Sequence, residues 1–158
     1  MRQEEFFAMK REVEEENEWR HRPENVYTRE GKAMISIVST SDRQLKQAVK
    51  QAVDMIGGVR RALNPKNRVL LKANFNSDDP YPASSDLGFL TAVVELLREE
   101  GITDLTLGER AGWPWMPTAQ VLEEMGVLKF AEKIDLPVID FDSGPWMDIK
   151  LGPDIISL

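Results

Sequence analysis

The chain has 158 residues, of which 42% are hydrophobic and 30% charged, which is enough for one soluble domain with a substantial core. Its formal net charge of −7 argues against a protein that binds nucleic acid, and the absence of cysteine excludes disulfides, thiolate zinc sites and cysteine-ligated iron–sulfur clusters within these residues. No apolar run approaches the roughly 20 residues of a membrane span, and no signal peptide is visible, so we expect a cytoplasmic protein that binds neither membrane nor nucleic acid.

Residues 1–32 are predicted to form a charged N-terminal helix and a linker. Phe6, Met9 and Val13 follow one another at helical spacing and give this helix a narrow apolar stripe. Such a stripe either packs on the body of the protein or forms a homo-oligomer with a second copy. Gly31 punctuates the linker that follows.

Residues 33–145 are predicted to form an α/β domain, because short apolar runs alternate with segments of helical periodicity. Good N-cap residues precede the expected helices, and glycine follows the second one. Residues 146–158 alternate apolar and polar side chains, which indicates a strand or an extended arm. The expected strands cover residues 33–38, 68–73, 104–107 and 137–141, and the expected helices residues 43–56, 87–99 and 118–134 with an interruption at Gly126.

This alternation predicts a mostly parallel sheet built from βαβ units with helices on both faces, preceded by the N-terminal helix. In an open parallel sheet the ligand binds outside the carboxyl ends of the strands. The polar residues at those ends are therefore the candidate site. The residues expected to bind a ligand there are Ser39, Asn74, Asn76, Asp78, Arg110 and Asp140.

Lys72 is the most informative of the strand-end residues. A lysine near the end of a buried strand must either reach the rim or find a partner. It therefore either presents its ammonium group to a carboxylate or phosphate ligand, or pairs with Glu109 or Asp140 on a neighbouring strand. If the site catalyses a reaction, Lys72 and Glu109 are the residues we expect to transfer protons.

The asparagines and aspartates after the second strand allow more than one interpretation. Asn74 and Asn76 lie on one side of an extended segment, where they either contact one ligand or stabilise the turn. Asp78 and Asp79 are adjacent, so their side chains diverge, and only Asp140 or Asp142 from a neighbouring strand would complete a Mg²⁺ or Ca²⁺ site with them. No phosphate-binding glycine motif occurs, so we assign no metal and leave the cofactor open.

Several segments together resemble a known family. They are VLLKANFNSDDPYPASS, ELLREEG, LTLGERAG and VLEEMGVLKFAEKIDLPVIDFD, and the combination is similar to the domain-of-unknown-function 362 family over about residues 33–142. The Lys-x-Asn element at the end of the second strand and the Gly-acid-x-x-Gly turn are the most specific parts. Ala73 stands where members carry proline, and Ser85 and Asp86 where they place threonine and histidine.

The resemblance implies an uncharacterised α/β protein, and some members carry a ferredoxin-like segment with 4Fe–4S clusters. It also implies a truncated or naturally short member, because family members continue past the fourth strand. Three functions follow as hypotheses. The first is binding of a small anionic ligand at the strand ends, the second is the cysteine-free part of an iron–sulfur oxidoreductase, and the third is a non-enzymatic oligomerising scaffold.

Overall fold

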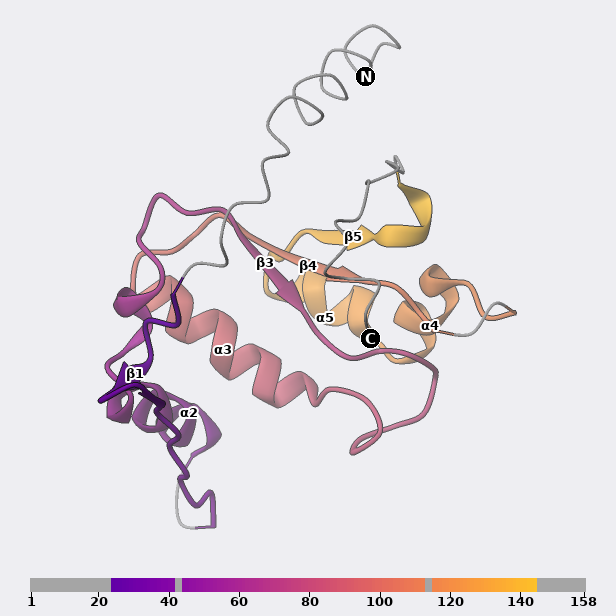
Figure 1. Cartoon of the computed structure of the whole chain (residues 1–158). Helices are drawn as coiled ribbons and strands as arrows, with labels where there is room; N and C mark the ends of the chain where they lie inside the picture. Colours follow the sequence, from indigo (N-terminus) through magenta and orange to yellow (C-terminus); the bar gives the residue numbers. More distant parts are fainter. Residues whose placement is uncertain (1–23, 42–43, 113–114, 145–158) are drawn as a thin grey trace, which may run out of the picture. The chain divides into compact units, whose positions relative to one another are not determined.

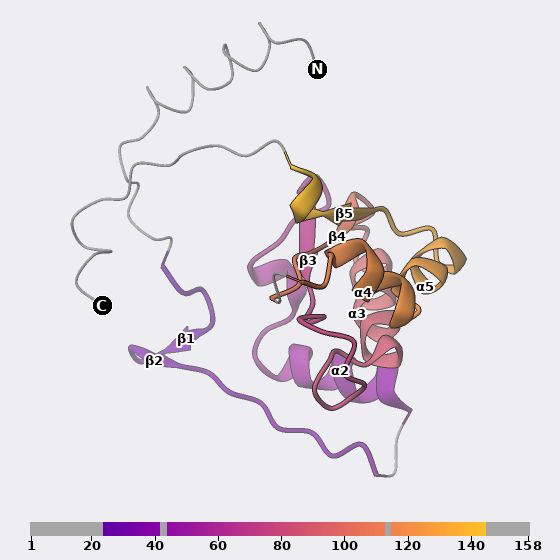
Figure 2. The ribbon, with the colours of Figure 1, turned by 90° about the vertical axis from the view of Figure 1, so that its right-hand side faces the viewer.

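The structure is a computed structural model that describes residues 24–41, 44–112 and 115–144 (Figures 1 and 2). The predicted N-terminal helix and the C-terminal strand or arm lie outside these residues. Residues 25–144 form a compact unit of their own. The remaining description concerns this unit.

A three-stranded parallel sheet lies at the centre of the fold. Strand β4 is the middle strand, between β3 and β5, and both pairings are parallel. The register pairs Lys72 with Gly108, and Glu109 with Asp140, so that the carboxyl ends of all three strands meet at one edge. The strands are β3 (Val69–Lys72), β4 (Leu105–Glu109) and β5 (Val138–Asp140). The α/β class and the parallel sheet predicted from the sequence are thus confirmed.

Local chemistry sets the start of α3 and the break between α4 and α5, whereas α2 and α4 begin without a side-chain cap. The carboxylate of Asp86 caps α3 by accepting a hydrogen bond of 2.7 Å from the amide of Phe89. Gly126 adopts a left-handed conformation with φ of 70° and separates α4 from α5, as its position in the sequence predicts. The helices are α2 (Leu45–Met55), α3 (Leu87–Glu99), α4 (Thr118–Glu124) and α5 (Val127–Lys133), with 3-10 turns at Val59–Arg61 and Phe141–Ser143.

The two faces of the sheet have different environments. On the inner face Leu105 and Leu107 are buried in a core that the helices complete. On the outer face Leu70 is 54% exposed and Ile139 is 48% exposed. Helices on both faces were predicted, but the helices that the structure describes pack against the inner face, because only this face carries a continuous set of buried apolar side chains.

The predicted first strand does not join the three-stranded sheet in the structure. Only its first residue, Ala33, joins a ladder, in the two-residue strand β2 (Lys32–Ala33) that pairs antiparallel with β1 (Thr28–Arg29). Residues 34–38 are irregular and lie beside α2, where the hydroxyl of Ser36 donates a hydrogen bond of 2.6 Å to the carbonyl of Ala52. This local contact, together with the β1–β2 turn, takes the place of the predicted pairing within the parallel sheet.

Gly108 allows the chain after β5 to pack closely on the outer face of β4. A Cβ atom at this position would lie 2.3 Å from Cζ of Phe141 and 2.8 Å from Cδ1 of Leu70. Both distances are shorter than any real Cβ contact, so the ring of Phe141 occupies space that only glycine leaves. The glycine thereby fixes the position of the 3-10 turn that carries Asp142.

We therefore expect Gly108→Ala to lower the free energy of unfolding by about 1–3 kcal/mol, the usual cost of overpacking. The measurement is urea unfolding of the parent, Gly108→Ala, Phe141→Ala and the double variant. Because Phe141→Ala removes the nearest atoms, Gly108→Ala should cost less in that background. Equal costs in both backgrounds would contradict this description of the contact.

Candidate functional site

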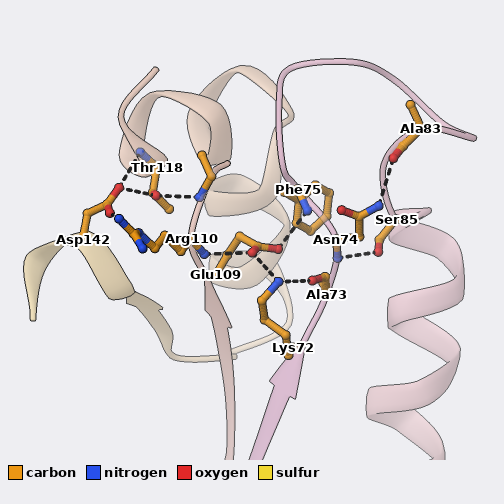
Figure 3. Close-up of polar contacts among 11 residues, drawn as sticks. Lys72, Ala73, Asn74, Phe75, Ala83, Ser85, Glu109, Arg110, Thr118 and Asp142 are labelled. Atoms are coloured by element: carbon orange, nitrogen blue, oxygen red, sulfur yellow. Dashed lines mark hydrogen bonds and ion pairs between the residues drawn. The ribbon is translucent and has the colours of Figure 1, made fainter. Parts of the chain in front are cut away.

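Two charged side chains meet where β3 and β4 end. The ammonium group of Lys72 lies 2.5 Å from Oε1 of Glu109 and also donates a hydrogen bond of 2.7 Å to the carbonyl of Ala73 (Figure 3). The pairing that the sequence allowed between Lys72 and Glu109 is thus present. The register places Lys72 opposite Gly108, the residue before Glu109, so the two side chains start from neighbouring positions at the carboxyl edge.

Glu109 is a buried carboxylate, and both of its oxygens accept hydrogen bonds or ion-pair contacts. Its position continues the inward-facing alternation of Leu105 and Leu107, and its exposure is 0%. Besides Lys72, Oε1 accepts a hydrogen bond of 2.8 Å from the amide of Arg110, and Oε2 accepts one of 2.8 Å from the amide of Phe75. These contacts compensate the cost of burying a charge and tie the chain after β3 to the chain after β4.

A second polar cluster lies beside the first and connects β4, α4 and the turn after β5 (Figure 3). Oδ1 of Asp142 accepts a hydrogen bond of 3.0 Å from Nε of Arg110. Oδ2 accepts hydrogen bonds from the hydroxyl of Thr118 at 2.5 Å and from its amide at 3.3 Å. The hydroxyl of Thr118, whose residue is fully buried, also accepts a hydrogen bond of 2.8 Å from the amide of Ala111.

These contacts change the acidity of Asp142. The hydroxyl of Thr118 and the guanidinium group of Arg110 both stabilise its ionised form, and together they hold the pKa of the carboxyl below its ordinary value of 3.8. Asp142 is thus an ionised anchor for Arg110.

The two asparagines take part in loop structure. The side-chain amide of Asn74 donates to the carbonyl of Ala83 at 3.0 Å, and its backbone amide donates to the hydroxyl of Ser85 at 2.9 Å. The carbonyl of Asn76 accepts a hydrogen bond of 2.9 Å from the amide of Gly112. A Cβ atom on Gly112 would lie 2.1 Å from the side-chain oxygen of Asn76, so this glycine lets the two loops approach each other.

The other predicted ligand-binding residues are less closely associated with this edge. Asp140 uses Oδ1 to accept a hydrogen bond of 2.8 Å from the amide of Asp142, which stabilises the turn. Asp78 is exposed on the loop after β3. Ser39 lies in the segment before α2 and its hydroxyl is 2.9 Å from that of Ser41. Among the described residues, no hydrogen bond joins Ser39 to the Lys72–Glu109 pair.

The described part of the chain contains no group of three or more histidine, cysteine, aspartate or glutamate side chains that could hold a metal ion. The alternative in which Asp78 and Asp79 combine with Asp140 or Asp142 is therefore not formed by these residues. In the same ranges, no helix is both long and apolar enough to cross a membrane.

Comparison with known proteins shows that this edge lies within the part of the chain that matches a family model. The model described as "Domain of unknown function (DUF362)" matches residues 69–157, which is more than half of the chain. The chain belongs to this family. A search of curated proteins and a search of solved structures each found no match. The DUF362 match contains β3, β4 and β5, and hence both polar clusters.

Two residues of the second polar cluster were not predicted as site residues. From the sequence, Thr118 is one of the residues expected to cap a helix, but in the structure its hydroxyl joins Ala111 to Asp142. Asp142 was expected at the carboxyl edge and as an alternative metal ligand, but was not predicted as a residue that binds the ligand. The sequence does indicate where Asp142 lies. It comes two residues after Asp140, at the end of the last expected strand, and therefore at the same edge of the sheet as Arg110.

The lowered pKa of Asp142 predicts a dependence of stability on pH. The ionised carboxyl contributes stability above its pKa in the unfolded chain, and this contribution is lost as the pH falls through the lower pKa of the folded state. We expect Asp142→Asn to lower the melting temperature at neutral pH, and the difference from the parent to shrink as the pH drops below about 4.

The measurement is thermal unfolding of both proteins across the acidic range. Asp104→Asn is the matched control, because Asp104 forms an exposed ion pair with Arg68 at 3.5 Å, and such pairs contribute little. A difference between Asp142→Asn and the parent that stays constant down to low pH would contradict the assigned role.

Proposed function

We propose that the carboxyl edge of the sheet binds a small anionic ligand that carries a carboxylate or a phosphate group. One observation carries this proposal: the side chain of Lys72 is held at the strand end by a buried partner, yet remains 54% exposed. A cation that is fixed in position and still open to solvent loses little entropy when it binds an anion.

The hydrogen-bonding capacity of Lys72 supports this function. An ammonium group has three donors, and two of them point to Glu109 and to the carbonyl of Ala73. One donor is left for a ligand. Arg110 supplies a second positive charge, since its side chain is 59% exposed and Asp142 fixes its orientation.

The remaining residues would surround the ligand in supporting roles. Asn76 is exposed where the two loops meet, and its amide can donate to a ligand oxygen. Asp78 and Asp140 add polar contacts around the edge. A proton-transfer step, if this edge catalyses one, falls to Lys72, because the oxygens of Glu109 are engaged by two backbone amides and the ammonium group.

The test is a thermal-shift titration with inorganic phosphate, acetate and malonate. A ligand at about 100 times its Kd stabilises the folded protein by about 2.7 kcal/mol, which is a shift of several degrees. We expect at least one anion to give such a shift in the parent and in Lys72→Arg, and none to do so in Lys72→Ala.

Lys66→Ala is the matched control, because Lys66 is an exposed lysine in the connection before β3. Each shift is measured against the variant's own melting temperature without ligand, so a loss of stability in Lys72→Ala does not affect the comparison. A shift that is retained in Lys72→Ala, or lost equally in Lys66→Ala, would contradict the proposal.

A further inference from the structure

Strand β3 is an edge strand of the sheet, and an apolar cavity lies beside it. Strand order leaves one edge of β3 without a neighbouring strand among the described residues. Next to this edge lies an open, almost entirely apolar cavity of about 330 Å³. Protein cores rarely leave such a space. The cavity is lined by Val69 and Leu71 of β3, by side chains of α2 and α3 that include Val53, Val93 and Leu97, and by Tyr27.

The segment Met34–Val38 has the properties of a strand without a sheet. Ile35 is 84% exposed and Ile37 is 88% exposed, and both are β-branched residues that favour strands. Residues 33–41 contain no charged residue, glycine or proline. Within the described residues, the backbone of residues 35–38 forms no hydrogen bond with another segment. An apolar strand of this kind is a site where strand pairing is expected.

The segment Met34–Val38 begins at the cavity and runs in the direction that a strand parallel to β3 would need. The amide of Met34 donates a hydrogen bond of 2.8 Å to the carbonyl of Tyr27, a residue that lines the cavity. Farther along, Ser36 contacts Ala52 in α2, and Val38 lies near Leu45 at the start of that helix. The segment is thus antiparallel to α2, which is the direction of a strand that precedes a crossover helix.

We propose that Met34–Val38 moves sideways from α2 and adds to the free edge of β3 as a fourth, parallel strand of the same chain. Ile35 and Ile37 then enter the apolar cavity, and Met34, Ser36 and Val38 lie on the outer face. The hydrogen bond between Ser36 and Ala52 is exchanged for a ladder of backbone hydrogen bonds. Closure removes two exposed isoleucines from water and fills the space beside the core.

Addition of this fourth strand would also bring Ser39 to the carboxyl edge of the sheet. Ser39 follows the segment directly, so it arrives at the carboxyl end of the added strand, at the edge that holds Lys72. Closure itself does not depend on anion binding, and its test uses no ligand.

The absence of cysteine allows a direct test by disulfide trapping in the full chain. Leu70 of β3 faces outward, and neighbouring strands lie about 4.8 Å apart, within the range that a disulfide spans. Leu70→Cys is combined in turn with Met34→Cys, Ser36→Cys and Val38→Cys, which covers the registers of a parallel pairing. The control pair is Ser36→Cys with Lys129→Cys, an exposed position on α5. It gives the rate of disulfide formation by random collision.

We expect at least one of the three pairs to form an intramolecular disulfide roughly tenfold or more faster than the control pair, because pairing raises the effective concentration. Mass spectrometry of the monomer band identifies it. Adding Ile35→Ala and Ile37→Ala should slow the same disulfide several-fold, since these side chains fill the cavity. Rates equal to the control for all three pairs would overturn the proposal, and so would disulfides that form only between two copies.

Discussion

The arrangement at the carboxyl edge of this sheet depends on the buried carboxylate of Glu109. A charge with no exposure is tolerated only when donors surround it, and here the donors come from both sides. The amide of Phe75 lies on the chain after β3, the amide of Arg110 on the chain after β4, and Lys72 at the end of β3. One side chain therefore positions both loops and the lysine that we propose as the ligand's main contact.

The contacts explain each position of the Gly-acid-x-x-Gly turn, residues 108–112, in this DUF362 member. Its first glycine makes room for the ring of Phe141, and its acidic residue is the buried Glu109. Arg110 donates a hydrogen bond to Asp142, and the amide of Ala111 donates one to Thr118. The second glycine, Gly112, makes room for Asn76. Each of the five positions thus meets a separate physical requirement, and together these join the ends of β3, β4 and β5.

Much of the fold could be predicted from the sequence, because the signals were local. The apolar runs of β3, β4 and β5 and the helix break at Gly126 were all present in the pattern of residues. The rule that parallel strands end at one edge made Glu109 one of the partners expected for Lys72, beside Asp140 and a ligand. The location of residues 33–38 could not be predicted, because a strand's pairing depends on non-local competition, here with α2 and the β1–β2 turn. The role of Thr118 also depends on a partner, Asp142, that is distant in sequence.

The most direct test of this account is amide hydrogen exchange, measured by NMR, at Phe75 and Arg110. If Glu109 holds both loops, both amides exchange slowly in the parent and in Lys72→Met, which keeps the carboxylate. In Glu109→Gln one side-chain oxygen becomes an NH2 donor, so the amide that faces it should lose most of its protection, while the amide of Leu107 in β4, which is bonded to Pro137, stays protected. Protection of Phe75 and Arg110 that is unchanged in Glu109→Gln would contradict the central role of this carboxylate.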